Sequence, residues 1–247
     1  MAVRLAPCEA HVDQASTESQ SRLEVADILR RFGPSYAQAH VVSPFEQRLI
    51  DDLITCRTAR LGGHLERCTQ CGFERQAYNS CRNRHCPKCQ TIAKMQWLEA
   101  RRAELLPTPY FHTVFTLPHE LNPLVLTNKR RLLDLLFQSA SETLLDFGKR
   151  RLHGRLGAIM ILYTWDQLLK PHVHVHALVP GGALADQGQT WNATKATYLF
   201  PVKALSTVFR AKFRDGLKRL YAEQALRFTG ATCDLEAVLK LLNQSFQ

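Results

Sequence analysis

Three histidines alternate with small apolar residues in the segment KPHVHVHALVPGG, which runs from Lys170 to Gly182. Successive side chains of an extended chain point to opposite sides, so His172, His174 and His176 share one face of a strand. Imidazole is a common metal ligand, and two or three such rings one strand pitch apart can hold a divalent cation. The alternative interpretation is a half-solvated strand whose polar face happens to be histidine. The segment therefore predicts a strand with a metal site on one face.

A second group of metal-binding side chains lies earlier in the chain, where six of the eight cysteines fall within residues 56–89. Cys68 and Cys71 have two residues between them, as do Cys86 and Cys89, and fourteen residues separate the pairs. Each Cys-x-x-Cys turn offers two thiolates, and four thiolates around one cation form the tetrahedral site of a structural zinc ion. We therefore predict structural Zn²⁺ on these four cysteines.

Four further residues in or beside this block carry side chains that bind metals. They could replace one of the four predicted ligands or form a second site. Taken singly, each is more simply an ordinary packed or surface residue. The sequence leaves these alternatives open for Cys56, His64, Cys81 and His85.

The charge of the chain points to a polyanionic partner. Lys and Arg number 32 against 22 Asp and Glu, which gives a formal net charge of +10. Basic residues crowd the cysteine block and one face of a later helix, where they could form a solvated surface or contact phosphates. We predict DNA contacts at Arg82, Arg84, Lys88, Arg210, Arg214 and Lys218.

Composition and hydropathy favour a globular protein of the cytoplasm. With 247 residues and 45% hydrophobic content, the chain can bury the core of one large or two modest domains. It contains no run of eighteen apolar residues and no signal-peptide pattern, so we expect no membrane partner. In a reducing cytoplasm, crowded cysteines indicate metal ligation more readily than disulfides.

The elements that must position these residues form an α+β protein. After a polar tail over residues 1–21, apolar stripes of helical period predict a helix ending at Gly33-Pro34 and another starting at Pro44 behind the cap Ser43. Further helices are expected over residues 91–106, 124–147, 203–227 and 231–247.

Strand patterns lie mostly in the second half of the chain. Residues 110–117 alternate enough for a strand, and the apolar run 157–165 predicts a central strand. The histidine strand follows after a connection too short for a parallel crossover, so the two should form an antiparallel hairpin. A short edge strand is expected over residues 198–202.

Together these segments resemble the zinc-containing transposases of the HUH rolling-circle insertion-sequence group, typified by insertion sequence 91. The run YNSCRNRHCPKCQ is the most specific part, and the similarity extends from about Leu23 to Phe228. The resemblance implies a helical, zinc-binding domain over residues 22–95 and an HUH endonuclease-like domain over residues 96–230, with an antiparallel sheet flanked by helices. The His-hydrophobic-His motif then corresponds to His174-Val175-His176, and His172 is a further possible ligand.

The resemblance also implies a mechanism and a partner. A divalent ion, Mg²⁺ or Mn²⁺, on the histidines would polarise a phosphate of single-stranded DNA at a transposon end, and a tyrosine would attack it. Such a protein would act near the nucleoid of a bacterial cytoplasm.

The nucleophile of that reaction is missing from the pattern. The family places its tyrosines in a Tyr-x-x-x-Tyr helix, and no such motif occurs in these 247 residues. The isolated tyrosines match packing positions, so we assign none of them to catalysis. We expect a chain that stops before the catalytic helix and binds metal and DNA without completing cleavage. The alternatives are an inactive DNA-binding remnant or regulator and a stand-alone metallohydrolase.

Overall fold

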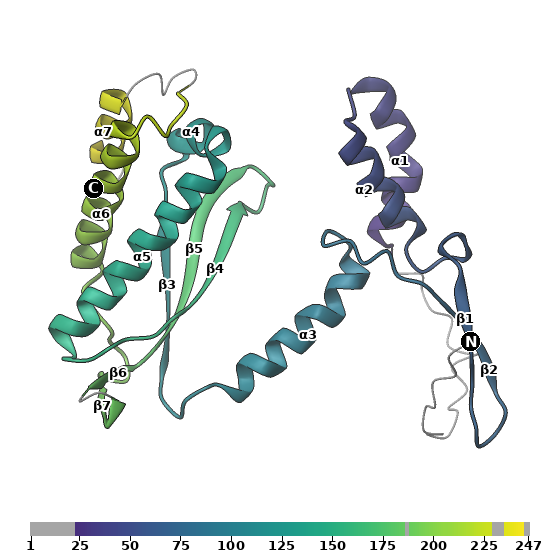
Figure 1. The fold of residues 1–247 in the computed structure, drawn as a ribbon, viewed down its shortest axis with the longest axis horizontal. Coiled ribbons are helices and arrows are strands. Elements are labelled where there is room, and N and C mark those ends of the chain that lie inside the picture. The colour runs from purple at the N-terminus through teal and green to yellow at the C-terminus, as the bar shows by residue number, and fades with distance from the viewer. Residues whose placement is uncertain (1–22, 186–187, 229–234, 245–247) are drawn as a thin grey trace. The chain divides into compact units, whose positions relative to one another are not determined.

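The computed structural model describes residues 23–185, 188–228 and 235–244. The tail expected over residues 1–21 and part of the last expected helix lie outside them. The chain divides into two compact units, residues 1–105 and 106–247, and each is described by itself below. Both combine helices with antiparallel strands, which confirms the α+β class (Figure 1).

Two antiparallel helices begin the first unit. Ser43 caps the second helix as predicted: its hydroxyl accepts a hydrogen bond from the Glu46 N–H, and its own N–H donates to the Glu46 carboxylate. The predicted end of the first helix at Gly33-Pro34 is wrong, because the helix continues through Pro34. Arg30 is exposed, so water can bind the carbonyl that a proline four residues later leaves without its helical donor. The two helices are α1 (Val25–Ala39) and α2 (Pro44–Thr55).

A β-hairpin and a third helix complete this unit. The strands pair antiparallel from Gly63 opposite Tyr78 to Arg67 opposite Glu74. The helix that follows starts at Pro87, where the missing N–H costs nothing because the first turn has no helical acceptor for it. The elements are η1 (Ala59–Leu61), β1 (Gly63–Arg67), β2 (Glu74–Tyr78) and α3 (Pro87–Ala103).

The second unit is organised around a three-stranded antiparallel sheet in the order β3-β5-β4. The predicted hairpin between the last two strands along the chain is confirmed. The prediction that the apolar run 157–165 forms the central strand is wrong: that run supplies an edge strand whose side chains alternate between half-buried and exposed, and the histidine strand is central. The strands are β3 (Tyr110–Thr116), β4 (Ile159–Trp165) and β5 (Pro171–Pro180).

Helices on one face of this sheet and a small hairpin complete the second unit. The helix expected over residues 124–147 is divided at Asn128, whose side-chain amide donates to the carbonyls of Leu124 and Arg227 and accepts from the Arg227 N–H. The expected edge strand over residues 198–202 does not form, because Leu199 and Phe200 pack into the core instead. The remaining elements are η2 (His119–Leu121), α4 (Asn122–Thr127), α5 (Lys129–Arg151), β6 (Gly182–Ala185), β7 (Thr190–Ala193), α6 (Val202–Ala222) and α7 (Leu235–Gln244).

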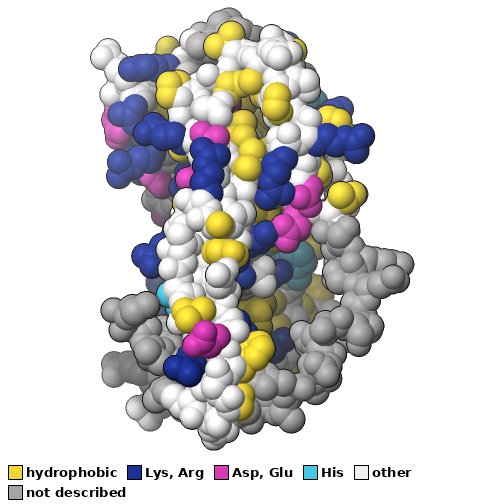
Figure 2. Space-filling model, turned by 90° about the vertical axis from the view of Figure 1, so that its right-hand side faces the viewer, with side chains coloured by type: hydrophobic (Ala, Val, Ile, Leu, Met, Phe, Trp, Pro, Cys, Tyr) yellow, Lys and Arg dark blue, Asp and Glu magenta, His cyan; other side chains and the backbone are white. Residues whose placement is uncertain are grey.

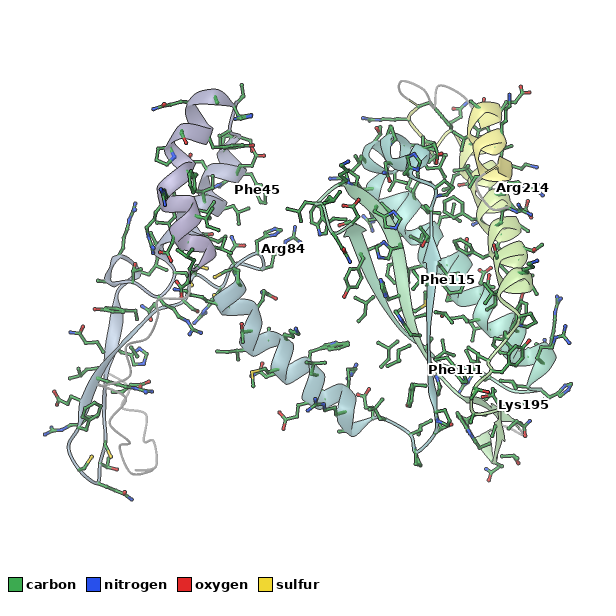
Figure 3. All side chains as sticks on the ribbon, turned by 180° about the vertical axis from the view of Figure 1, so that it is seen from behind. Phe45, Arg84, Phe111, Phe115, Lys195 and Arg214 are labelled. Carbon is green, nitrogen blue, oxygen red and sulfur yellow. The ribbon has the colours of Figure 1, made fainter. Side chains whose placement is uncertain are left out.

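The core lies between one face of the sheet and helices α5 and α6. Val175, Ala177 and Val179 of β5 are fully buried there. Phe115 of β3 packs against Phe209 of α6 with ring centroids 5.1 Å apart, and Figure 3 shows Phe115 on the helix side of the strand. Burial of alternate residues fixes the register, because a slip by one position would turn every apolar side chain to the other face. Among the described residues, no helix has both the length and the apolar character needed to cross a bilayer.

Helices α5 and α6 approach closely at Gly216, and this contact is testable. A Cβ atom built on Gly216 would lie 3.3 Å from Leu135 Cγ and nearer still to one of its methyl groups. Gly216→Val should therefore lower the free energy of unfolding by about 1–3 kcal/mol, the usual cost of overpacking. The better helix propensity of valine opposes this by less than about 1 kcal/mol. Urea denaturation followed by circular dichroism measures the difference.

The matched control is Gly157→Val. A Cβ atom at Gly157 would meet nothing within 4 Å, so this variant should unfold at the wild-type urea concentration. Equal stability of the two variants would show that the close approach of the helices is not needed.

Candidate functional site

Four cysteines of the first unit gather their sulfur atoms within 4.8 Å of one another. Cys86 and Cys89 are two of the predicted zinc ligands, but their partners here are Cys56 and Cys81 rather than Cys68 and Cys71. Within the described residues, no other group of three or more histidine, cysteine or acidic side chains is as compact.

The hairpin explains why residues so distant in sequence meet. Cys56 caps the end of α2, and Cys81 lies just after β2. The hairpin closes between them: the Arg57 N–H donates to the Asn79 carbonyl, and the Asn79 N–H donates to the Gly62 carbonyl. The base of the hairpin therefore brings the two cysteines together, and the start of α3 adds the other two.

The spacing of the sulfur atoms fits a zinc ion. The Sγ atoms of Cys56 and Cys86 lie 3.4 Å apart, those of Cys56 and Cys89 3.6 Å, and those of Cys81 and Cys89 3.7 Å. Four sulfurs at the usual Zn–S distance of about 2.3 Å lie about 3.8 Å apart along the edges of a tetrahedron. A small adjustment of the side chains therefore gives a tetrahedral Cys₄ site.

The four thiols also perturb one another. Burial raises the pKa of Cys56 and of Cys81. Burial acts in the same direction on Cys89, but hydrogen bonds from the three neighbouring thiols outweigh it and lower the pKa of Cys89 to about 7. One thiolate is thus stabilised at neutral pH, and a bound cation would stabilise the others in the same way.

The remaining metal-binding side chains of this unit lie elsewhere. Cys68 and Cys71 sit in the turn at the far end of the hairpin, where Gly72 adopts a φ of 71° and donates its N–H to the Cys68 carbonyl. His64 contacts Glu66 at 3.4 Å, and His85 accepts a hydrogen bond from Arg84. The structure therefore does not bring Cys68, Cys71, His64 or His85 into the cysteine cluster.

The second unit presents the predicted histidines on the sheet face opposite the core. The rings of His172 and His174 have centroids 4.7 Å apart, and those of His174 and His176 are 4.8 Å apart. All three side chains are half-buried, whereas the intervening Val173 and Val175 are buried. The cross-strand neighbours on the histidine face are Val114 and Ile161 beside His176, and Thr116 and Tyr163 beside His174.

A fourth histidine, which the sequence interpretation missed, joins this face. His112 on β3 stacks on His176, and its Nε2 atom lies 2.6 Å from Nδ1 of His176. Two ligands on adjacent positions of an octahedral ion with bonds of about 2.1 Å are separated by about 3 Å, so this pair needs little adjustment to share a cation. The alternation in YFHTVFT, with His112, Val114 and Thr116 on one side, was the signal that could have revealed it.

The protonation of the rings suits metal binding. His174 Nδ1 lies 3.0 Å from the His172 carbonyl, which can only accept, so Nδ1 donates this hydrogen bond and Nε2 is the nitrogen that can bind a metal. Burial, with smaller effects from His174 and His112, lowers the pKa of His176. His176 is therefore neutral near pH 7 and able to act as a ligand.

The predicted DNA-contacting residues are distributed over both units. Arg82 and Arg84 are exposed, and Lys88 forms an ion pair with Glu24 at 2.5 Å. On α6, Lys218 is exposed, whereas Arg210 and Arg214 are half-buried. The surface in Figure 2 carries many Lys and Arg side chains with exposed hydrophobic ones between them.

Lys212 of α6 has a structural role instead. Its ammonium contacts Asp146 at 3.0 Å and Glu142 at 3.3 Å, both on α5. Burial lowers the pKa of Lys212, but the two carboxylates outweigh it and raise the pKa above its ordinary value. This cation therefore joins two helices of the core, and the two carboxylates neutralise its charge, which makes it a weaker site for a phosphate.

Two family models match the chain. Residues 28–117 match the family described as "Transposase zinc-binding domain", and this range contains all four clustered cysteines and His112. Residues 157–246 match the family described as "Putative transposase", and this range contains β4 and the histidine strand.

Two curated proteins are similar to the chain over long stretches. "Putative transposase y4qJ" of Sinorhizobium fredii is 45% identical over 213 residues, covering 85% of this chain and 54% of the relative. The transposase for insertion sequence element IS801 of Pseudomonas savastanoi pv. phaseolicola is 37% identical over 145 residues, covering 58% of this chain and 35% of the relative. The chain thus spans about half the length of the first of these relatives and about a third of the second.

Among solved structures, the conjugative relaxase TrwC in complex with mutant oriT DNA is similar to part of the fold. The identity is 19% and the TM-score 0.38, over 44% of each chain. The chain is thus similar, over residues 28–117 and 157–246, to zinc-binding transposases of insertion sequences.

Proposed function

We propose that this chain is the metal- and DNA-binding part of an HUH-class transposase. It binds the single-stranded ends of a transposon near the nucleoid of a bacterial cytoplasm and holds a phosphate of that strand at His174 and His176. The observation that carries the proposal is the face of the central strand β5 opposite the core, where alternate residues place these half-buried imidazoles in a row.

In this proposal the residues of the sheet hold and orient a divalent ion, Mg²⁺ or Mn²⁺. His174 offers Nε2, because its other nitrogen donates to the His172 carbonyl. His176 is held neutral by burial, and His112 stands close enough to act as a third ligand. A bound ion would supply Lewis-acid polarisation of the phosphate, and His172 lies beside His174 as a further possible ligand.

The first unit would present positive charge on a zinc-stabilised framework. We assign the structural zinc ion to Cys56, Cys81, Cys86 and Cys89, whose sulfur atoms already form a compact group. The predicted pairing of Cys86 and Cys89 with Cys68 and Cys71 remains the competing ligand set. In the proposal the phosphates of the strand are contacted by Arg82, Arg84, Lys88, Arg210, Arg214 and Lys218.

A second candidate function is a DNA-binding regulator that does not cleave. It is favoured by the exposure of Arg82, Arg84 and Lys218, because binding of phosphates by such residues needs no nucleophile. Such a chain would occupy the same single-stranded DNA as an active enzyme and compete with it.

A nicking assay on single-stranded element ends, with Mn²⁺ or Mg²⁺, tests the proposal. Binding that weakens steeply with salt is expected, because each neutralised phosphate releases counterions. A covalent protein–DNA adduct that disappears in His174→Ala and His176→Ala would show catalysis by this chain. Binding without an adduct would favour the regulator. Turnover of small phosphodiesters without DNA binding would contradict both and favour a metallohydrolase.

A further inference from the structure

The exposed face of the sheet offers more than imidazoles, because apolar side chains flank the histidines on both edge strands. Val114 of β3 is 47% exposed, Ile161 of β4 is 42% exposed and Tyr163 of β4 is 47% exposed. Among the described residues, helices α5 and α6 pack on the opposite face, around Val175 and Ala177. These three side chains therefore form an exposed apolar border on either side of the histidines.

Tyr163 is placed by the strand register directly beside the candidate metal ligands. It pairs with His174 across β4 and β5, so the two side chains leave the same face of the sheet. Its ring centroid lies 5.5 Å from that of His174, at an interplanar angle of 24°, and 4.4 Å from that of His176. One side of the aromatic ring thus rests on the imidazoles, and much of the remainder is open to solvent.

We propose that Tyr163 is the stacking platform for an unpaired nucleobase next to the phosphate held by the histidines. This inference rests on the proposed function, because it needs single-stranded DNA at the histidine face. The base on the sugar next to that phosphate is less than one nucleotide away from it. Tyr163 is the direct cross-strand neighbour of His174, so its ring is close enough to contact that base. Aromatic stacking tolerates any base, since every base has a π face.

The charge and shape of this face favour a nucleobase over a protein segment. The chain carries a net charge of +10, so a polyanion is attracted to it. The apolar patch is narrow, because it consists of single side chains on either side of a row of histidines. A row of phosphate-binding groups with an aromatic ring beside it matches the alternating phosphates and bases of one strand. Tyr163 acts here by positioning the strand, not by chemistry of its own.

The experiment compares two fluorescent oligonucleotides of equal length, oligo-dT and the same backbone with abasic sites, binding to the full 247-residue chain. Tyr163→Ala should weaken oligo-dT binding roughly five- to hundredfold, the range of one lost stacking contact. The same substitution should leave binding of the abasic strand unchanged. Tyr163→Phe, which keeps the ring and removes the hydroxyl, should bind both strands like the wild type.

Controls separate stacking from damage to the fold. Tyr198→Ala removes another tyrosine of the second unit, one that is 50% exposed and lies outside the sheet, and should change neither affinity. Equal weakening of the binding of both oligonucleotides by Tyr163→Ala would overturn the inference. It would indicate damage to the histidine site, which binds phosphates and so affects a strand with or without bases. Wild-type affinity of Tyr163→Ala for oligo-dT would overturn it as well, with the proposed function intact. If the wild type binds neither strand, both the inference and the proposed function fail.

Discussion

Replacement of Cys56 by serine is expected to abolish zinc binding by the first unit and to remove its cooperative thermal transition. Cys56 lies within 3.4 Å of Cys86 and 3.6 Å of Cys89, so its thiolate would complete the Cys₄ site. Among the described residues of this unit, the buried hydrophobic cluster consists of Leu53 and two of the cysteines themselves, and Ala26 is the other buried apolar residue. Structural zinc contributes about 10–16 kcal/mol in zinc-finger peptides, far more than so small a core can replace. Elemental analysis and thermal circular dichroism measure the two effects.

Cys68→Ser is the matched control, because Cys68 belongs to the ligand set predicted from spacing but lies in the hairpin turn. This variant should retain its zinc and its thermal transition. The reverse result, with zinc lost from Cys68→Ser and kept by Cys56→Ser, would support the Cys-x-x-Cys pairs. A wild type with two zinc ions, one of which survives in each variant, would indicate a second site on the hairpin.

His174→Ala should lower the affinity of the second unit for Mn²⁺ at least about 10-fold. Loss of a residue that merely orients a metal ligand costs 10- to 100-fold, and loss of a ligand should cost no less. His174 has its Nε2 lone pair fixed by the hydrogen bond from Nδ1 to the His172 carbonyl, so no rearrangement is needed to bind. Isothermal titration of the full chain with Mn²⁺, after zinc has been supplied to saturation, measures the change.

His119→Ala controls for nonspecific binding by histidine, since this imidazole is 79% exposed and lies in η2, outside the sheet. It should bind Mn²⁺ like the wild type. His112→Ala is informative in a different way: a loss comparable to that of His174→Ala would identify it as a ligand. If His174→Ala keeps the wild-type affinity, the histidine face is not the metal site and the alternative of a polar strand face holds.

The sequence allowed the α+β class and the family to be predicted, but it did not identify the group of cysteines that comes together. Cys-x-x-Cys spacing is a local signal, and it singled out Cys68 and Cys71. Cys56 and Cys81 have 24 residues between them, and only the antiparallel ladder from Gly63 to Tyr78 brings their backbones near each other. A ligand set closed by a hairpin has no fixed spacing, so no local pattern predicts it.

The strand assignments show a similar limit. The run 157–165 is the most apolar stretch, and apolar content alone favoured a central position. Its alternation of half-buried and exposed side chains belongs instead to an edge strand with one open face. The histidine strand is central although its outer face is polar, because sheet order depends on pairing partners and not on hydropathy. His112 was missed for the same reason: its proximity to His176 follows from the pairing of β3 with β5.

The folding of the two candidate metal centres should depend on metal in opposite ways, and the central position of β5 explains one side of this contrast. Strand β5 is hydrogen-bonded along both edges, and its inner residues are fully buried, so its amides should exchange with solvent only when the whole unit unfolds. The histidines are therefore held in place before any ion arrives, and a chelator would leave their scaffold intact. The cysteine cluster has almost no other core around it, so removing zinc would remove the structure. In a cell depleted of metal ions, the first unit would therefore unfold, whereas the second unit would stay folded and could bind its ion later.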